Sequence, residues 1–398
     1  MPEREMERSA SGPLQGIRVL DFGAFLAGSY HATLMGDLGA DVIKVEPLGG
    51  DPTRQVGPFI AGESRIFVGW NRNKRGLAVD LRTEAGLKVV YDLVQTADVV
   101  TTNFRPRAAK KLKVDYDTLA ALNPQLIYST STGFGSKGPL SEKPAYDGIL
   151  QSMGGIAKSN EATSGKVSVA APVFIDIQTA TLALGAVLAA LFHRERTGEG
   201  QLVETSLLQG VMVVQPHAFC QALEKEEEGG AGAYPYKMFE TEDGHIFVGA
   251  TQDKFWRSLC LVLGLPALAE DSRYATIPER VERYKELAEL IDPIMLQKKS
   301  VEWEALLEDA GVPCGAVRGA AEFFDHPQVA ANDMDLVINH TTIGPMRVMG
   351  VPFHFGKSPG EIQRSAPLLG EHTKEILREL EYDDEQIEKL EREGAIAF

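Results

Sequence analysis

One carboxylate, Asp176, precedes a long apolar stretch and is the residue whose surroundings best suit chemistry. No charged residue follows it before Arg194, and His193 is the first titratable one. A helix that is apolar on all sides is normally buried on all sides, so the stretch predicts a central helix with Asp176 in its first turn. There a carboxylate either caps the helix or acts as a nucleophile whose anion the first-turn amides favour. A capping box would have Glu or Gln where the sequence has Thr179, and both roles stay open.

The densest basic stretch of the chain follows a predicted strand at residues 98–104. It consists of Arg105, Arg107, Lys110, Lys111 and Lys113. A phosphate-bearing ligand suits such a stretch, because cations and the free amides of a following helix both attract anions. A solvated basic surface is the alternative, since charge runs are common on protein surfaces.

A glycine-rich loop at residues 133–138 has the spacing GxGxxG after a later strand. Pro139 follows where a dinucleotide site needs a helix, and no acidic strand end lies about 20 residues further on. The pattern therefore argues against a dinucleotide site and indicates a loop whose backbone approaches a ligand.

Strand and helix patterns alternate through the first half of the chain. Apolar stretches at residues 17–21 and 41–46 predict buried strands, and the segment between them predicts a helix that ends at Gly39. The alternation continues to a strand at residues 126–132. It predicts an α/β fold with a doubly wound parallel sheet, whose ligands bind at the carboxyl ends of the strands.

The composition is that of a soluble globular protein, with 44% hydrophobic and 24% charged residues among 398 and a net charge of −16. So acidic a chain lacks the basic face that nucleic-acid binding needs. Three widely spaced cysteines, Cys220, Cys260 and Cys314, exclude a disulfide framework and a zinc site of the usual spacing. Neither an apolar run of membrane-span length nor an apolar N-terminal segment is found, so we expect a cytoplasmic protein without a nucleic-acid or membrane partner.

Around residues 222–232 the sequence becomes charged and glycine-rich, which indicates a loop or a domain boundary. We expect a large Rossmann-like domain at 1–222, a smaller α/β domain at 223–330 and a further segment at 331–398. The last of these reads as strands followed by two short capped helices.

Several segments resemble the class III CoA-transferase family, the group of formyl-CoA transferase and of carnitine and bile-acid CoA-transferases. They include LDFGAFLAGS at 20–29, NRNKRGLAVD at 71–80, ADVVTTNFRP at 97–106 and APLLGEHTKEIL at 366–377. The resemblance runs nearly end to end. It implies a large domain built from both ends of the chain and an interlocked homodimer, in which each chain threads through the other.

The family nucleophile is an Asp at the start of the long apolar helix, which falls on Asp176. In the family it forms a mixed anhydride with the acyl group, and the released CoA converts this into an aspartyl-CoA thioester that an acceptor carboxylate attacks. The resemblance implies no metal and no bound cofactor, since coenzyme A enters as part of the substrate. The family's CoA contacts fall on Phe25, Leu26, Ala27, Val79, Arg82, Asn103, Phe104, Lys111 and Tyr146, and its glycine-rich substrate loop falls on Gly229, Gly230 and Gly232.

The chain departs from the family pattern at two basic positions. Lys111 stands where relatives have Arg, which keeps the charge and loses the bidentate geometry. Pro47 stands where the oxalate-type member has another Arg, and Lys44, Arg75 and Lys143 are the candidates to replace it.

Two other functions stay open. The same fold hosts α-methylacyl-CoA racemases, which carry His-Asp where this chain has Tyr146 and Asp147, but a tyrosine, with a pKa of about 10, replaces imidazole poorly. The chain could also be a non-catalytic subunit of a heteromeric CoA-transferase, although it retains Asp176. The sequence does not identify the acid substrate. Arg54 and Arg65 are candidates to bind the second carboxylate of a dicarboxylate such as succinate.

Overall fold

The protein is described by a computed structural model that covers residues 12–220 and 232–398. The described residues form two compact units: one comprises residues 12–220 and 331–398, and the other residues 232–330. The chain thus leaves the first unit once and returns to it.

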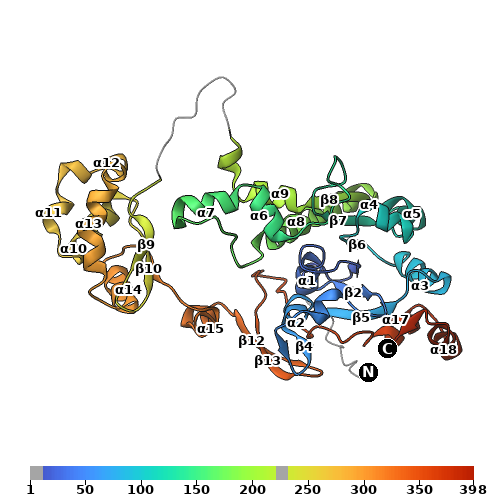
Figure 1. Ribbon diagram of the computed structural model, residues 1–398. Helices are drawn as coiled ribbons and strands as arrows, with labels where there is room; N and C mark the ends of the chain where they lie inside the picture. The colour runs from blue at the N-terminus through green and yellow to red at the C-terminus, as the bar shows by residue number, and fades with distance from the viewer. Residues whose placement is uncertain (1–11, 221–231) are drawn as a thin grey trace. The chain divides into compact units, whose positions relative to one another are not determined.

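A seven-stranded sheet forms the centre of the first unit (Figure 1), in the order β14-β5-β2-β1-β6-β7-β8. All neighbouring strands are parallel except β14, which pairs antiparallel with β5. The strand order reverses between β1 and β6, as in a doubly wound fold. The strands are β1 (Arg18–Asp21), β2 (Asp41–Glu46), β5 (Lys74–Val79), β6 (Val99–Thr102), β7 (Ile127–Thr132), β8 (Gln201–Ser206) and β14 (Ile396–Ala397).

Helices cover both faces of this sheet because successive strand residues point to opposite faces. Val19 belongs to a core with α1 (Tyr30–Asp37) and α8 (Phe174–Thr197), whereas Leu20 belongs to the core on the other face. The helices of that second core are α3 (Glu84–Val94), α5 (Tyr116–Leu122), α17 (Thr373–Glu379) and α18 (Asp384–Arg392).

Shorter elements complete the first unit. Its helices are α2 (Arg65–Trp70), α4 (Pro106–Lys111), α6 (Asp147–Met153), α7 (Ile156–Ser164) and α9 (Leu207–Val213), with 3-10 turns η1 (Pro52–Gln55) and η2 (Pro216–Phe219). Two hairpins join β3 (Phe59–Ile60) with β4 (Glu63–Ser64) and β12 (Asp335–His340) with β13 (Gly344–Met349).

The second unit packs helices on a three-stranded antiparallel sheet around its own core, which includes Trp256 and Trp303. The strands are β9 (Tyr236–Glu240), β10 (His245–Gly249) and β11 (Cys314–Ala316). The helical elements are α10 (Asp253–Val262), α11 (Pro266–Ala269), η3 (Ser272–Tyr274), α12 (Ile277–Glu282), α13 (Tyr284–Met295), α14 (Ser300–Asp309), α15 (Ala320–Phe324) and α16 (Pro327–Ala331).

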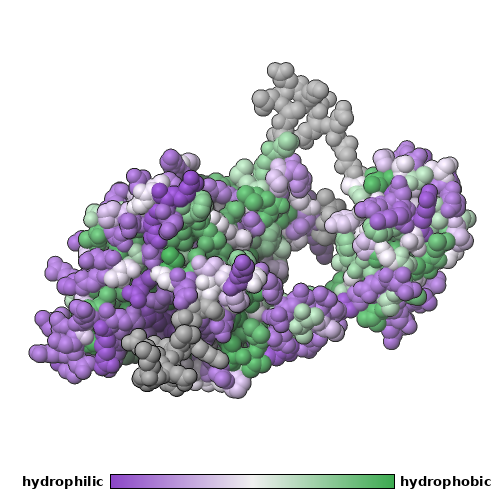
Figure 2. Space-filling view, turned by 180° about the vertical axis from the view of Figure 1, so that it is seen from behind, coloured by the Kyte–Doolittle hydropathy of each residue, from purple (hydrophilic) through white to green (hydrophobic). Residues whose placement is uncertain are grey.

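Helix α8 is buried on one face only, which corrects the expectation of burial on all sides. Ala183 and Val187 pack into the core, whereas Phe192 is 66% exposed and Ile177 38% exposed. Other apolar residues also lie exposed on the face shown in Figure 2. Within the part of the chain that the structure describes, only α8 has the length and apolarity of a membrane span, with 39% of its most apolar window buried. The expectation that no stretch has this character is therefore wrong, although α8 packs against α1, β7 and β8 as a core helix does.

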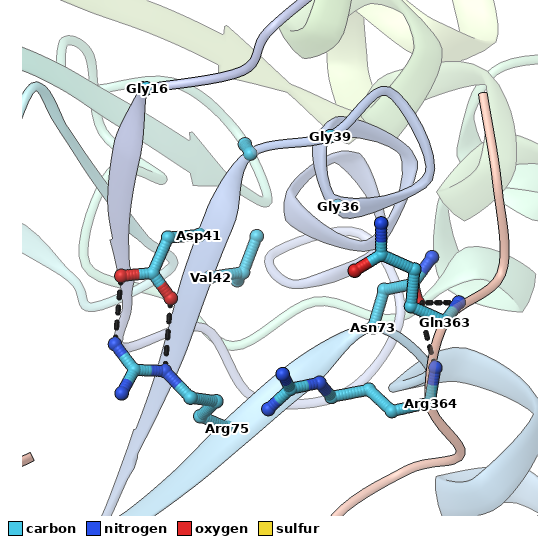
Figure 3. Close-up of a pocket in the computed structure, with 10 residues that line it drawn as sticks. Gly16, Gly36, Gly39, Asp41, Val42, Asn73, Arg75, Gln363 and Arg364 are labelled. Atoms are coloured by element: carbon cyan, nitrogen blue, oxygen red, sulfur yellow. Dashed lines mark hydrogen bonds and ion pairs between the residues drawn. The ribbon is translucent and has the colours of Figure 1, made fainter. Parts of the chain in front are cut away.

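Arg75 lies at the amino ends of the strands, away from the end that the fold uses for ligands. It donates from Nε and Nη2 to Asp41 at 2.9 and 2.7 Å (Figure 3) and also pairs with Glu375 and Glu379. Its pKa is raised further, because these carboxylates outweigh the opposing effect of burial. Arg75 is thus fully paired, which contradicts the expectation that it replaces the missing family arginine.

Candidate active site

The loops that follow β1 and β6 diverge at the reversal of strand order and define a crevice at the carboxyl ends. Asn103 joins the two loops, since its Oδ1 accepts from the Ala24 amide at 3.0 Å and its Nδ2 donates to the Ala24 carbonyl at 2.7 Å. Gly28 packs directly on this side chain, because a Cβ on Gly28 would lie 2.5 Å from Asn103 Cγ. Phe25 has a φ of 57°, a region that bulky residues rarely adopt. Close packing therefore fixes the turn after β1.

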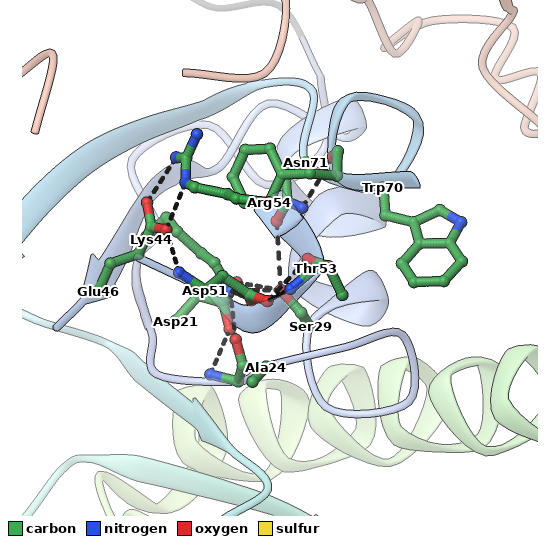
Figure 4. A network of polar contacts seen from close by, with 12 residues as sticks. Asp21, Ala24, Ser29, Lys44, Glu46, Asp51, Thr53, Arg54, Trp70 and Asn71 are labelled. Carbon is green, nitrogen blue, oxygen red and sulfur yellow. Dashed lines mark hydrogen bonds and ion pairs between the residues drawn. The ribbon is translucent and has the colours of Figure 1, made fainter. Parts of the chain in front are cut away.

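A buried ion cluster supports this turn (Figure 4). Lys44 Nζ lies 2.9 Å from Asp51 Oδ2, and Lys74 Nζ lies 2.7 Å from Asp21 Oδ2. Burial alone would raise the pKa of Asp21, but the charges of Lys74 and Lys44 hold it below its usual range. The cluster holds the backbone of Gly23 through two hydrogen bonds, since its amide donates to Asp21 and its carbonyl accepts from Lys44. Lys44 lines the larger cavity described below together with Pro47, but its ammonium group is buried and paired with Asp51, which weighs against it as the replacement for the family arginine.

Asp176 lines a cavity of about 170 Å³ beside the turn. The resemblance-derived residues Phe25, Ala27, Asn103 and Tyr146 line the same cavity. Two cationic residues join them: Arg105, whose Nη1 donates to the Glu142 carbonyl at 3.1 Å, and Lys143. Of the three proposed replacements for the family arginine, Lys143 is the one that faces this cavity.

Asp176 is the third residue of α8 and does not cap it. The residue before the helix, Val173, makes no side-chain cap, and Asp147 of α6 caps the helix instead. Its Oδ2 accepts from the amides of Ile175 at 2.7 Å and Asp176 at 3.2 Å. The capping interpretation of Asp176 is therefore wrong, and its carboxylate is left for another role.

The environment of Asp176 favours the protonated form of its carboxyl group. Burial, and secondly the negative charge of Asp147, raise the pKa of Asp176 from 3.8 to about 7. No described residue donates a hydrogen bond to the Asp176 carboxylate oxygens. A carboxylate of this kind is a stronger base than an ordinary aspartate and titrates near neutral pH.

A larger cavity of about 420 Å³ lies on the opposite side of the same loops. Val79, Arg82 and Phe104 line it, as does Pro47. Its walls are mainly apolar, while the Arg82 side chain is 80% exposed and pairs with Asp80 at 2.8 Å. Together the two cavities offer an apolar recess, exposed cations and a carboxylate, the features that a long nucleotide thioester needs.

Some predicted residues lie outside both cavities. Leu26 is buried in the core with α1 and α8. Lys111 is exposed as the last residue of α4, next to Leu112, which lines the larger cavity. Gly232 belongs to the second unit and is exposed, whereas Gly229 and Gly230 lie outside the described residues.

Sequence reasoning missed the cap from Asp147 and the polar wall formed by Ser131 and Thr132. Ser131 and Thr132 had a readable signal, since they end a predicted strand just before the glycine-rich loop. Asp147 had none, because its hydrogen bond spans 28 residues.

A sequence profile described as CoA-transferase family III matches residues 14–373. The chain is 34% identical to the succinyl-CoA:glutarate CoA-transferase of Mus musculus, over 96% of this chain and 90% of that protein. It is 36% identical to the succinate--glutarate CoA-transferase of Agrobacterium fabrum, over 93% and 96% respectively. Among solved structures, a CAIB/BAIF family protein from Brucella suis is similar, with a TM-score of 0.81 and 33% identity over 93% of this chain and 100% of that one.

The chain therefore belongs to CoA-transferase family III, and it is an enzyme that transfers CoA. The expected α/β fold with a large parallel-sheet domain is confirmed.

Proposed function

We propose that the enzyme moves CoA from an acyl-CoA donor to a free carboxylic acid through covalent intermediates on Asp176. A carboxylate oxygen of Asp176 attacks the thioester carbonyl, the carbon–sulfur bond breaks, and CoA leaves as a thiolate from a mixed anhydride. The thiolate attacks the aspartyl carbonyl, which releases the donor acid and leaves an aspartyl-CoA thioester. The acceptor carboxylate attacks this thioester, the carbon–sulfur bond breaks, and CoA thiolate leaves from a second anhydride. This thiolate attacks the acceptor's acyl carbon, which forms the new acyl-CoA and regenerates the carboxylate of Asp176.

The main support for this proposal is that the carboxylate of Asp176 is free to react. Asp147 caps α8, so the carboxylate oxygens of Asp176 accept no hydrogen bond from any described residue, although Asp176 lies in the first turn of the helix. The helix N-terminus there favours negative charge that develops during attack. A pKa of about 7 also makes the anion more basic, and hence more nucleophilic, than an ordinary aspartate.

The two cavities support a division of CoA binding between them. We propose that the nucleotide end occupies the cavity lined by Val79, Arg82 and Phe104, near Lys111, and that the thioester lies in the cavity of Asp176. Tyr146 and Phe25 would flank the thioester, since their rings meet edge to face with centroids 5.8 Å apart.

A dicarboxylate such as succinate is the proposed acid, because both relatives named above carry succinate or succinyl-CoA together with glutarate in their names. Their identity of about one third with this chain supports the class of acid rather than one particular acid.

An interlocked homodimer in the cytoplasm completes the proposal. The support comes from apolar side chains that lie exposed within two turns of α9, Leu208, Met212 and Val213, besides Phe192 of α8. Exposed apolar surface of this kind usually marks an interaction site.

Asp176→Asn tests the proposed chemistry. The amide has nearly the same shape but cannot attack a thioester as an anion, so transfer falls by several orders of magnitude, by about 10⁴-fold or more. Transfer is measured by mass analysis of acyl-CoA products from a panel of donors and acids. The exposed substitution Asp117→Asn on α5 is the control. Near-normal transfer by Asp176→Asn, with deamidation excluded by peptide mass, contradicts the proposal.

A further inference from the structure

An apolar pocket of about 460 Å³ adjoins the start of α8, and we call it the arginine pocket. Side chains of α1, α2, α8 and β13 line it, among them Tyr30, Trp70 and Ile177. Ile177 directly follows Asp176, and consecutive Cα atoms lie about 3.8 Å apart. One wall of the arginine pocket is therefore next to the backbone of the proposed nucleophile.

Of the described residues, three arginines and no Asp or Glu line the arginine pocket, in a chain whose net charge is −16. Arg72 is balanced by Asp37, with Nη2 2.6 Å from Oδ2. Arg347 is balanced by Asp335, with Nη2 2.8 Å from Oδ2. The third arginine, Arg65, has no such carboxylate among the described residues.

Arg65 also contributes nothing evident to its own helix. It is the first residue of α2, where the positive end of the helix dipole disfavours a cation. The helix is capped by Ser64, whose Oγ accepts from the Phe67 amide at 3.3 Å. An exposed, unpaired guanidinium on the wall of an apolar pocket suits an anion with a short carbon chain.

Arg54, the other candidate for a second carboxylate, is already occupied. It donates from Nε and Nη2 to Glu46 at 2.8 and 2.7 Å, and its guanidinium lies 3.7 Å from the centroid of the Phe67 ring. The two arginines, which are equivalent candidates in the sequence, therefore differ in the structure: Arg54 pairs with a carboxylate of the protein, and Arg65 pairs with none among the described residues.

We propose that the arginine pocket binds the carbon chain of a dicarboxylate and that Arg65 binds the carboxylate distal to the reacting one. Arg65 is then a specificity-determining residue that selects diacids over monoacids. This inference rests on the proposed function, because the reacting carboxylate or thioester has to lie at Asp176.

The test measures one ratio, kcat/KM for a diacid divided by kcat/KM for its monoamide, with the pairs succinate and succinamate and glutarate and glutaramate. Each monoamide keeps the chain length and removes the distal charge. The wild type prefers the diacids. Arg65→Gln lowers the ratio by about 10- to 100-fold, the usual effect of losing a charge-assisted hydrogen bond. Arg65→Lys lowers it less, since it keeps the charge and loses the bidentate fork.

Lys143→Gln is the matched control, because it removes a cation from the Asp176 cavity instead, and it leaves the ratio near the wild-type value. An unchanged ratio in Arg65→Gln, with a wild-type melting temperature, overturns the inference, as does a wild type that does not prefer diacids. A ratio that collapses in Lys143→Gln alone moves the distal carboxylate to that cavity and also overturns it. A wild type that transfers no CoA to any acid would instead refute the proposed function, and the inference would fall with it.

Discussion

Asp147 has two effects at the start of α8. Its Oδ2 accepts the amides of Ile175 and Asp176, and its charge opposes the ionisation of Asp176. It is itself buried, and its other oxygen accepts from the side-chain amide of Gln151. These contacts leave it poorly placed to donate or accept a proton at a substrate, and the neighbouring Tyr146 is no imidazole. The pair therefore favours nucleophilic use of Asp176 over racemase chemistry.

Asp147→Asn separates the two effects, since asparagine still accepts hydrogen bonds and carries no charge. Burial remains the main cause of the raised pKa of Asp176, but the second cause disappears, so this pKa falls. The rise of kcat/KM with pH, expected through about pH 7 in the wild type, moves to lower pH. The measurement is a pH profile at limiting acyl-CoA. A rise at the same pH in both proteins would rule out Asp147 as a determinant.

The same carboxyl group makes stability depend on pH. Its pKa is raised from 3.8 to about 7 on folding, so between these values the native state binds more protons than the unfolded state. Stability from this group is therefore lost as pH rises through this window. Asp176→Asn removes the effect. The melting temperature of the variant minus that of the wild type should therefore increase by roughly 2–4 °C from about pH 5 to about pH 8. No cap is lost, because Asp147 supplies it. A gap that stays constant with pH would argue that the pKa of Asp176 is not raised on folding.

At the scale of elements, local patterns predicted the sheet well and the surroundings of α8 poorly. The strand expected at 41–46 is β2, and the one expected at 17–21 contains β1 (Arg18–Asp21). These predictions succeeded because strands and helices depend on the hydrophobic pattern of residues that are close in sequence. The composition of α8 could not reveal which face stays open. Nor could it place Asp147 at the start of that helix.

The turn after β1 gives a prediction at this scale. In Gly28→Ala the added Cβ would lie 2.5 Å from Asn103 Cγ, so the side chain that joins the two loops has to move. Overpacking of this kind costs about 1–3 kcal/mol of stability. Because the displaced loops line both cavities, we expect KM for acyl-CoA to rise by about fivefold or more, the factor that corresponds to about 1 kcal/mol. Gly148→Ala in α6 is the control, since nothing lies within 4 Å of its added Cβ. Equal KM values for the two variants would contradict the role given to this packing.

At the scale of the whole molecule, the first unit is built from both ends of the chain, with residues 221–330 inserted between them. The proposed interlocking of two such chains means that the subunits cannot separate while folded. We expect light scattering to give the mass of a dimer at all working concentrations, and we expect dissociation to coincide with unfolding in denaturant. A folded monomer populated on dilution would exclude interlocked chains, although not CoA transfer.

The covalent role of Asp176 is tested most directly by trapping. The enzyme is incubated with acyl-CoA alone, treated with borohydride or hydroxylamine, digested, and examined by mass spectrometry of the peptide that contains position 176. An aspartyl thioester or anhydride is electrophilic, so borohydride should reduce residue 176 to an alcohol, and hydroxylamine should convert it to a hydroxamate only when acyl-CoA is present. An unmodified Asp176 in enzyme that still exchanges CoA between acids, under conditions where a stoichiometric adduct would be detected, would contradict the mechanism.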